Sequence, residues 1–199
     1  MKNDKVKVRS KELLSDNWYL LNKVTYDILN ADGEWETQIR EVYDRGNGAA
    51  ILLYNKDERT VVLTKQFRLP TYLNGNDSGQ LIEVCAGLLE EDNAEECIIR
   101  ETEEETGYKI SKVEKIFESY MSPGVITEIL HFFIGEYDSS MKVSEGGGLA
   151  EEQENIEVIE LDFDTAYNMI KTGDIKDSKT IMLLQYAMIN ELMPMKKDN

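Results

Sequence analysis

The chain has 199 residues, of which 41% are hydrophobic, and a formal net charge of −17 at pH 7. This length and composition suffice for one globular domain with a small appendage, whereas the acidic charge argues against nucleic acid or an anionic membrane surface as a partner. No signal peptide is visible and no apolar run has membrane-spanning length, so we expect a cytoplasmic protein. Cys85 and Cys97 lie in apolar segments and are expected to be reduced core thiols.

The N-terminal part of the chain is predicted to form a β-hairpin. Residues 18–29 partly alternate and are rich in aromatic and aliphatic side chains, Asp32 and Gly33 provide a turn, and residues 35–43 fit a second strand. An isolated hairpin is only marginally stable in water. We therefore expect it to pack on the rest of the chain or on a second copy.

The remainder of the chain alternates strands with separated helices. Apolar, β-branched runs predict strands over residues 48–55, 60–67, 81–87, 113–120, 126–137 and 156–161. Residues 138–155 are polar, contain three consecutive glycines and are predicted to form a mobile surface loop. This order predicts an α/β fold with a mixed sheet sandwiched between helices.

Two helices are predicted to close the chain. The first has Asp164 as its N-cap and ends at Gly173, and the second begins near Asp177. The second helix is expected to carry a buried face formed by Ile181, Leu184, Met188 and Leu192.

A further helix, in the middle of the chain, is strongly acidic. It is predicted to start after Asn93, a suitable N-cap, and to end at Gly107, which suits the left-handed position after the last turn. At about 100° per residue, Glu101, Glu104 and Glu105 share one face, close to the end where the helix dipole disfavours anions. Such crowding requires a compensating cation, and magnesium with oxygen ligands is the natural candidate. The alternative is a solvated acidic face without a ligand.

This helix resembles the signature of the Nudix hydrolases. The run Arg100-Glu101-Thr102-Glu103-Glu104-Glu105-Thr106-Gly107 follows that signature closely, although Gly87 ahead of it is displaced by one residue and Thr102 stands where an aliphatic residue is usual. The resemblance extends outside the helix to the group of this family that includes the ADP-ribose and GDP-mannose pyrophosphatases. It is carried there by residues 40–49, 65–68, 74–76, 121–124 and 146–148.

The resemblance implies the Nudix fold for residues 47–199, and for residues 1–46 a β region that forms a homodimer with a shared active site. It implies magnesium-dependent hydrolysis of a nucleoside diphosphate sugar, with GDP-mannose giving GMP and mannose 1-phosphate. One alternative is ADP-ribose or another nucleotide sugar as the substrate. Two others are a non-catalytic sensor of nucleotide sugars and an acidic protein that only buffers metal ions.

The resemblance also implies roles for individual residues. The implied catalytic residues are Glu154, Glu104 and Arg100. The implied metal ligands are the carbonyl of Ala86 and the carboxylates of Glu101, Glu105 and Glu154. The implied substrate contacts are Trp18, Arg40, Glu41, Arg68, Ala86, Gly87, Glu105, Glu128, Gln153 and Lys179.

Several of these assignments have a structural alternative. Arg40 and Arg68 fit ordinary salt-bridge partners, Trp18 fits aromatic packing within the hairpin, and Glu128 fits an outward polar residue on a strand. Lys179 is predicted to lie in the first turn of the last helix, where a lysine is unfavourable unless an anion is present.

The loop carboxylate has competing candidates. Glu154 fits best by its position before the last strand, while Glu151 and Glu152 remain open beside it. Its role is either general base or metal ligand, because a mobile loop can close a carboxylate over a substrate. His131, the only histidine, is expected to pack within its strand and not to bind a metal.

Overall fold

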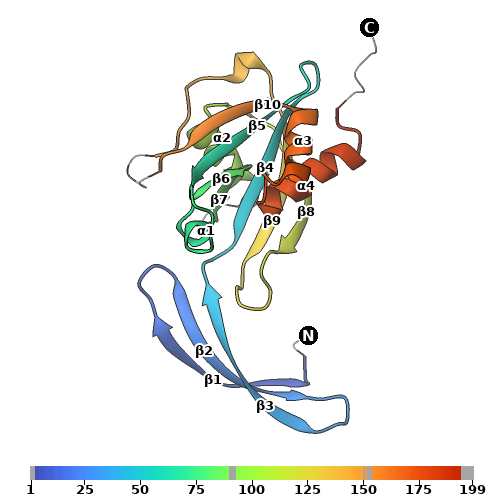
Figure 1. Cartoon of the computed structure of the whole chain (residues 1–199). Helices are drawn as coiled ribbons and strands as arrows, with labels where there is room; N and C mark the ends of the chain where they lie inside the picture. The colour runs from blue at the N-terminus through green and yellow to red at the C-terminus, as the bar shows by residue number, and fades with distance from the viewer. Residues whose placement is uncertain (1–2, 90–92, 150, 152–153, 194–199) are drawn as a thin grey trace. The chain divides into compact units, whose positions relative to one another are not determined.

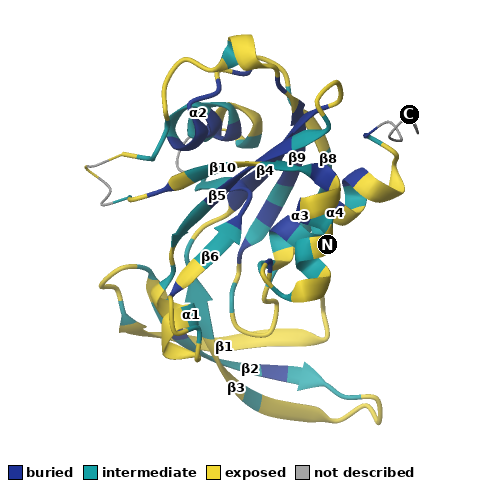
Figure 2. Ribbon diagram, turned by 45° about the horizontal axis from the view of Figure 1, so that its top comes forward, coloured by how far each residue is buried: buried dark blue, intermediate teal, exposed yellow. Residues whose placement is uncertain are grey.

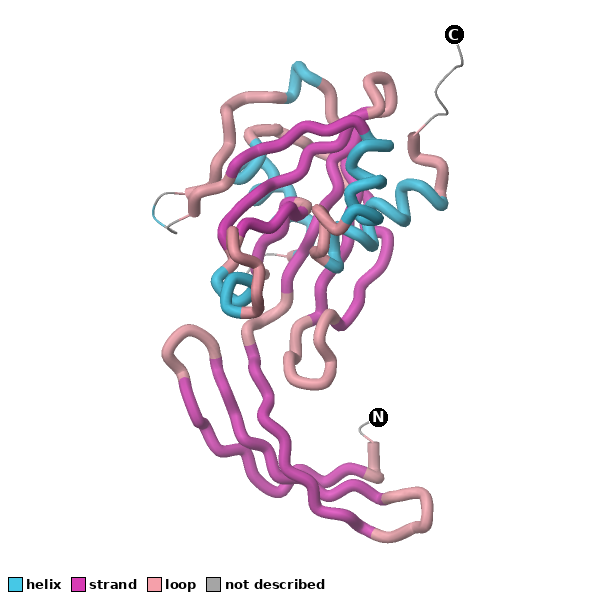
Figure 3. Tube along the Cα trace, in the orientation of Figure 1, coloured by secondary structure: helices cyan, strands magenta, loops and turns pink. Residues whose placement is uncertain are grey.

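The computed structural model describes residues 3–89, 93–149, 151 and 154–193. It contains two compact units, one formed by Met1–Asn47 with Tyr120–Ile129 and the other by Gly48–Ser119 with Leu130–Asn199 (Figure 1). The described helices all belong to the second unit, whereas the first is built on strands (Figure 3). No helix of the described residues combines the length and the apolar character needed to cross a membrane.

The first unit is built on an antiparallel sheet with the order β1-β2-β3, formed by Val6–Ser15, Leu20–Leu29 and Trp35–Asp44. Strands β2 and β3 are the predicted hairpin, with Leu29 opposite Trp35 at the turn. Strand β1 was not predicted, because its charged, largely exposed residues lack the apolar alternation of a half-buried strand. It is held by pairing with β2 and by side-chain contacts such as Arg9 Nε to Asp27 Oδ2, 2.6 Å apart.

The second unit contains a mixed sheet, which confirms the predicted fold class. Its central order is β10-β5-β4-β9-β8, with β6 paired to β5 and β7 paired to β4. Strands β4 and β9 are parallel, while β4 is antiparallel to β5 and β7. The strands are β4 Gly48–Asn55, β5 Thr60–Phe67, β6 Gln80–Glu83, β7 Cys85–Leu88, β8 Glu114–Tyr120, β9 Ile129–Glu136 and β10 Glu157–Asp162.

The core of this unit lies on both faces of β4, which is buried along its whole length. Ala49, Ile51 and Leu53 pack in one cluster with Ile98 of helix α2, Ala94–Thr106. Helices α3, Phe163–Thr172, and α4, Ser178–Ile189, lie on the opposite face of the sheet (Figure 2). The free thiols of Cys85 and Cys97 are buried, as predicted.

The prediction of one strand over residues 81–87 was wrong. Strand β6 pairs with β5 and ends at Glu83, opposite Thr64. Strand β7 pairs with β4 and begins at Cys85, opposite Ile51. Between them, the backbone N–H of Val84 donates to the hydroxyl of Thr180, 2.8 Å away, so this amide serves helix α4 and not the sheet. This crossing leads into β7, which carries Ala86 and Gly87 beside helix α2.

The predicted N-cap of α3 also needs correction. The cap is Asp162, whose side chain accepts the N–H of Thr165, 3.1 Å away. Asp164 lies inside the first turn and pairs with Arg59, 2.9 Å away. Both carboxylates suit a helix N-terminus. Because β10 ends at Asp162, this residue directly precedes the first turn of α3 and serves as the cap.

Helix α4 begins after Asp177 as predicted, but its predicted buried face is shifted. The buried residues are Thr180, Leu183, Leu184 and Ala187. Met188 is exposed, and Leu192 lies beyond the helix, which ends at Ile189. A short helix, α1, over Leu69–Leu73 was not predicted and buries none of its residues.

Candidate active site

Helix α2 forms the frame of the candidate site, and its ends are those predicted from the sequence. The Asn93 side chain accepts the N–H groups of Glu95 and Glu96, and Gly107 ends the helix with φ 77°. Thr102 is buried despite its hydroxyl, because the hydroxyl donates to the carbonyl of Ile98, 2.6 Å away. A polar residue at the usual aliphatic position therefore leaves the packing of the helix intact.

Glu105 is the most unusual residue of the helix, since its side chain is only 2% exposed. Its carboxylate accepts hydrogen bonds from the Cys85 thiol and the Ala86 N–H. Its Oε2 atom has no hydrogen-bond partner among the described residues. Burial, together with the charges of Glu101 and Glu154, raises the pKa of Glu105 to about 8. A buried carboxylate oxygen without a partner is costly unless a ligand supplies one.

Glu101 lies directly against the turn that carries Gly87. A Cβ atom added at Gly87 would lie 2.3 Å from both Cγ and Cδ of Glu101. Only glycine leaves room for this carboxylate, so β7 and helix α2 approach each other closely at this point. Ala86 and Gly87 thus lie beside Glu101 and Glu105, as the sequence predicted.

Arg100 joins two of the glutamates. Its Nη1 atom lies 2.9 Å from Oε2 of Glu104 and 3.2 Å from Oε1 of Glu101. The arginine therefore fixes the positions of both carboxylates. Glu103, on the other side of the helix, pairs instead with Lys109, 3.1 Å away.

The three glycines of the loop after β9 are docked on the C-terminal end of α2, which the prediction of a mobile surface loop did not foresee. The N–H of Gly147 donates to the Glu105 carbonyl, 2.9 Å away, and that of Gly148 to the Glu104 carbonyl, 3.2 Å away. Gly146 has φ 68°, and a Cβ atom there would lie 2.4 Å from the Glu105 carbonyl oxygen. The loop thus satisfies carbonyl groups that a helix end leaves unpaired.

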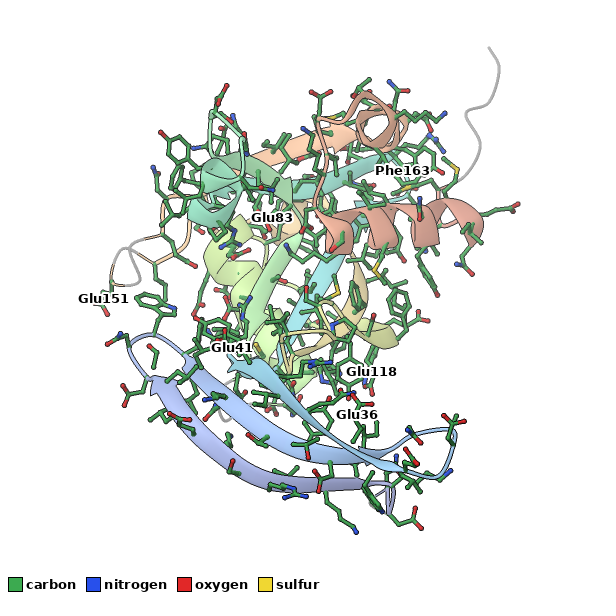
Figure 4. The ribbon with its side chains drawn as sticks, turned by 60° about the horizontal axis from the view of Figure 1, so that its bottom comes forward. Glu36, Glu41, Glu83, Glu118, Glu151 and Phe163 are labelled. Carbon is green, nitrogen blue, oxygen red and sulfur yellow. The ribbon has the colours of Figure 1, made fainter. Side chains whose placement is uncertain are left out.

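The loop glutamates differ in their surroundings. Glu154 is partly buried, and its Oε2 atom accepts the N–H of Leu149, 3.1 Å away. The Glu154 side chain lies against Gly148, where an added Cβ atom would be 2.3 Å from its Oε2, and the N–H of Gly148 donates to the Glu104 carbonyl of the acidic helix. Glu151 is exposed (Figure 4). Gln153 and Glu152 lie outside the described residues.

Arg68 and Lys179, two of the implied substrate contacts, meet at one carboxylate. Arg68 directly follows β5 and its Nε atom lies 2.7 Å from Oε2 of Glu83. Lys179, in the first turn of α4 as predicted, binds the other oxygen of Glu83 and lies 3.0 Å from Asp177. Glu83 was not predicted as a site residue, although it is the only charged residue in the run from Leu81 to Gly87.

The remaining candidates belong to the first unit. Trp18 is 82% exposed and stacks edge-on against Tyr19. Arg40 of β3 donates to the carbonyl of Ile39, 2.8 Å away, and Glu41, on the same strand, is exposed. The remaining candidate, Glu128, is 9% exposed and pairs with Arg45 at 3.6 Å, so it is not the outward-facing residue of the alternative interpretation.

Comparison with known families identifies the family to which this sheet and acidic helix belong. A model of the NUDIX domain matches residues 44–183, which cover the sheet, the acidic helix and the glycine loop. The chain belongs to the NUDIX family. A second model, the GDP-mannose pyrophosphatase NudK N-terminal domain, matches residues 5–43.

Curated relatives match this NUDIX chain over nearly its whole length. The GDP-mannose pyrophosphatase of Escherichia coli O1:K1 / APEC is 56% identical over 182 residues, which are 92% of this chain and 94% of the relative. That of Yersinia enterocolitica is 58% identical over the same shares of both chains. That of Pectobacterium atrosepticum is 56% identical over 184 residues.

NUDIX enzymes generally use a divalent metal, and the acidic helix offers suitable donors. The donors are all oxygens, as magnesium prefers, and Oε2 of Glu105 is buried without a partner. Gly87 leaves space for the Glu101 carboxylate at the same turn. Among the residues that the structure describes, no three acidic, histidine or cysteine side chains are already gathered around one point. The partnerless Glu105 oxygen and the Glu101 carboxylate at the glycine turn nevertheless fit a metal that takes its other ligands from the substrate or from water.

The raised pKa of Glu105 predicts how stability depends on pH. The folded value, about 8, lies above the ordinary value of 4.5. The stabilising contribution is therefore complete below pH 4.5 and is lost as the pH rises through the folded pKa. In EDTA, we expect the free energy of unfolding, measured by urea titration, to fall from pH 5 to pH 8.

Glu105→Gln is the control for this pH dependence, because an amide does not titrate. We expect the variant to show a smaller decrease than the wild type over the same pH range in EDTA. Saturating Mg²⁺ should likewise reduce the decrease in the wild type, since a metal binds the deprotonated carboxylate. Equal slopes for variant and wild type in EDTA would contradict the proposed titration of Glu105.

Proposed function

We propose that this chain hydrolyses GDP-mannose at its diphosphate bond, giving GMP and mannose 1-phosphate. The observation that carries the proposal is the buried, partnerless oxygen of Glu105 beside Glu101 at a glycine turn. It occurs in a NUDIX chain that is 56–58% identical to curated GDP-mannose pyrophosphatases. ADP-ribose or another nucleotide sugar is the second candidate substrate. A non-catalytic sensor is less favoured, because the acidic helix is intact.

The proposed metal site consists of Glu101, Glu105, the Ala86 carbonyl and Glu154. When bound there, Mg²⁺ would neutralise charge on the diphosphate and make a water molecule more acidic. Burial of Glu105 supports this assignment, because an ionised carboxylate in that position needs a positive partner. In our proposal, Glu154 supplies an oxygen ligand and accepts the proton of the attacking water.

The chain's other residues bind and orient the substrate in this proposal. Arg68 and Lys179 bind the phosphates, which are the most negative part of a nucleotide sugar. Arg100 holds Glu104 and Glu101 in place through its contacts of 2.9 and 3.2 Å. Gly87 and Gln153 complete the proposed substrate contacts, the latter outside the described residues.

We also propose a cytoplasmic homodimer in which the N-terminal β region contributes to a shared active site. Exposed apolar residues on this unit, including Val8, Leu13, Trp35 and Ile39, support an interface. Trp18, Arg40, Glu41 and Glu128 would then contact the substrate.

The function is tested by incubating the protein with GDP-mannose, ADP-ribose and other nucleotide sugars in Mg²⁺. We expect GMP and mannose 1-phosphate from GDP-mannose, identified by chromatography and mass spectrometry, and no turnover in EDTA. Water labelled with a heavy oxygen isotope identifies the attacked phosphorus, since the label enters only one product. Faster turnover of ADP-ribose would favour the second candidate substrate. Absence of any monophosphate would overturn the hydrolase in favour of a sensor.

A further inference from the structure

The network around Glu83 suggests a role that the proposed function does not include. Glu83, labelled in Figure 4, is the last residue of β6. Its side chain is 4% exposed. One carboxylate oxygen binds Nε of Arg68 and the other binds Nζ of Lys179. Both oxygens are therefore used, each by a cation from a different element of the fold.

Glu83 is unsuited to contact a nucleotide sugar itself. It is buried, its oxygens already accept hydrogen bonds, and its negative charge would repel a diphosphate. The two cations, in contrast, keep donors for a ligand. Arg68 is bound through Nε. Within the described part of the chain its two terminal nitrogens have no other partner, so in a side chain that is 41% exposed they offer a ligand a planar fork. Lys179 donates to Glu83 and lies 3.0 Å from Asp177, which leaves at least one of its three N–H donors for a ligand.

The network is rigid because it closes on the backbone. Asp177 accepts both the N–H and the hydroxyl of Thr180, at 2.9 and 2.6 Å. The Thr180 oxygen in turn accepts the N–H of Val84, the residue next to Glu83, from 2.8 Å. The end of β6 and the first turn of α4 are thus fixed to each other, and with them the carboxylate and the ammonium group.

The same short segment also leads to the proposed metal site. Glu83 is followed at once by the crossing from β6 to β7, on which Ala86 and Gly87 lie beside Glu105 and Glu101. The chain thus passes from the carboxylate that binds the two cations to the proposed metal site within five residues, Glu83–Gly87.

We propose that Glu83 is a positioning residue that holds Arg68 and Lys179 together as one diphosphate-binding pair. This inference rests on the proposed function, because it assigns both cations to the phosphates of its substrate. It adds that a buried carboxylate sets the distance between the cations before the substrate arrives. Preorganisation of this kind lowers the entropic cost of binding.

The test compares the binding of inorganic pyrophosphate to wild type and Glu83→Gln by calorimetry in EDTA, where the cations act without metal. The amide keeps the shape of the side chain but can accept from only one of the two cations. We expect about tenfold weaker pyrophosphate binding. With GDP-mannose and Mg²⁺, KM should rise about tenfold while kcat changes much less, the pattern of lost substrate binding. Glu157→Gln is the matched control, since the side chain of Glu157 is 64% exposed and pairs with Lys65 of the same sheet.

Two further variants separate positioning from general stability. Adding Glu83→Gln to an Arg68→Gln/Lys179→Met background should weaken pyrophosphate binding no further, because the groups that Glu83 positions are gone. If Glu83→Gln does not fold, Glu83→Asp replaces it, because the shorter side chain cannot reach both cations. Pyrophosphate affinity equal to wild type in the folded Glu83 variant would overturn the proposal. So would unchanged affinity in both Arg68→Gln and Lys179→Met.

The outcome is separable from that of the proposed function. A wild-type protein that binds pyrophosphate through Glu83 but cleaves no nucleotide sugar would refute the hydrolase and leave the positioning role in place. Normal hydrolysis by the wild type, together with unchanged pyrophosphate binding and KM in Glu83→Gln, would refute the positioning role of Glu83 and leave the hydrolase in place.

Discussion

Replacing Glu105 by glutamine is expected to lower kcat/KM for GDP-mannose about a thousandfold, because losing one metal ligand forfeits about 4 kcal/mol of transition-state stabilisation. The amide matches the carboxylate in shape, and the buried oxygen that lacks a partner loses its charge. Folding should therefore be retained. Steady-state kinetics and the Mg²⁺ concentration for half-maximal activity are the measurements, with circular dichroism as the test of folding.

Glu103→Gln is the matched control for this variant. Glu103 lies on the same helix, two residues earlier, but its side chain is 42% exposed and pairs with Lys109. The same chemical change there removes only a surface ion pair, which is worth little. Turnover near the wild-type level in Glu105→Gln, or an equal loss in Glu103→Gln, would contradict the assignment of Glu105.

Gly87→Ala is expected to lower kcat/KM about a hundredfold with little loss of stability. The new Cβ atom would lie 2.3 Å from Cγ and Cδ of Glu101. A flexible side chain can turn away to relieve this clash, so the fold survives while the carboxylate leaves its place, and displacements of about 1 Å can cost this much activity. Kinetics at increasing Mg²⁺ should show a raised metal requirement.

The control for this substitution is Gly124→Ala, where an added Cβ atom meets no atom within 4 Å. Its melting temperature and turnover should remain near those of the wild type. Wild-type turnover and metal requirement in Gly87→Ala would mean that Glu101 does not act from its place against this turn.

The ends of the acidic helix could be predicted because their signals are local. Asn93 caps the N-terminus and Gly107 takes the left-handed conformation, whatever the rest of the chain does. The break at Val84 could not be predicted in this way. Its cause is the Thr180 hydroxyl, 96 residues away in the chain, which takes the amide that a continuous strand would have used.

The candidate site shows the same division. Helical spacing placed Glu101, Glu104 and Glu105 on one face, but periodicity does not indicate which of them is buried or paired. Packing distinguishes them, since Glu105 is buried against Cys85 and Ala86 while Glu104 is tied to Arg100. Glu83 could not be predicted as a site residue, because a single charge in an apolar run forms no spacing pattern with other charged residues. Its partners Arg68 and Lys179 come from distant segments of the chain.

The docking of Gly146, Gly147 and Gly148 on the end of α2 has a consequence for protein engineering. Gly147 and Gly148 join the backbone of the segment before β10 to the carbonyls of Glu105 and Glu104, and Gly146 packs against the Glu105 carbonyl. A shortened or lengthened segment ahead of Leu149 would therefore shift the register of the whole connection against the helix. Transplanting segments from other hydrolases to alter selectivity should accordingly keep the glycine triplet and vary the chain only beyond it.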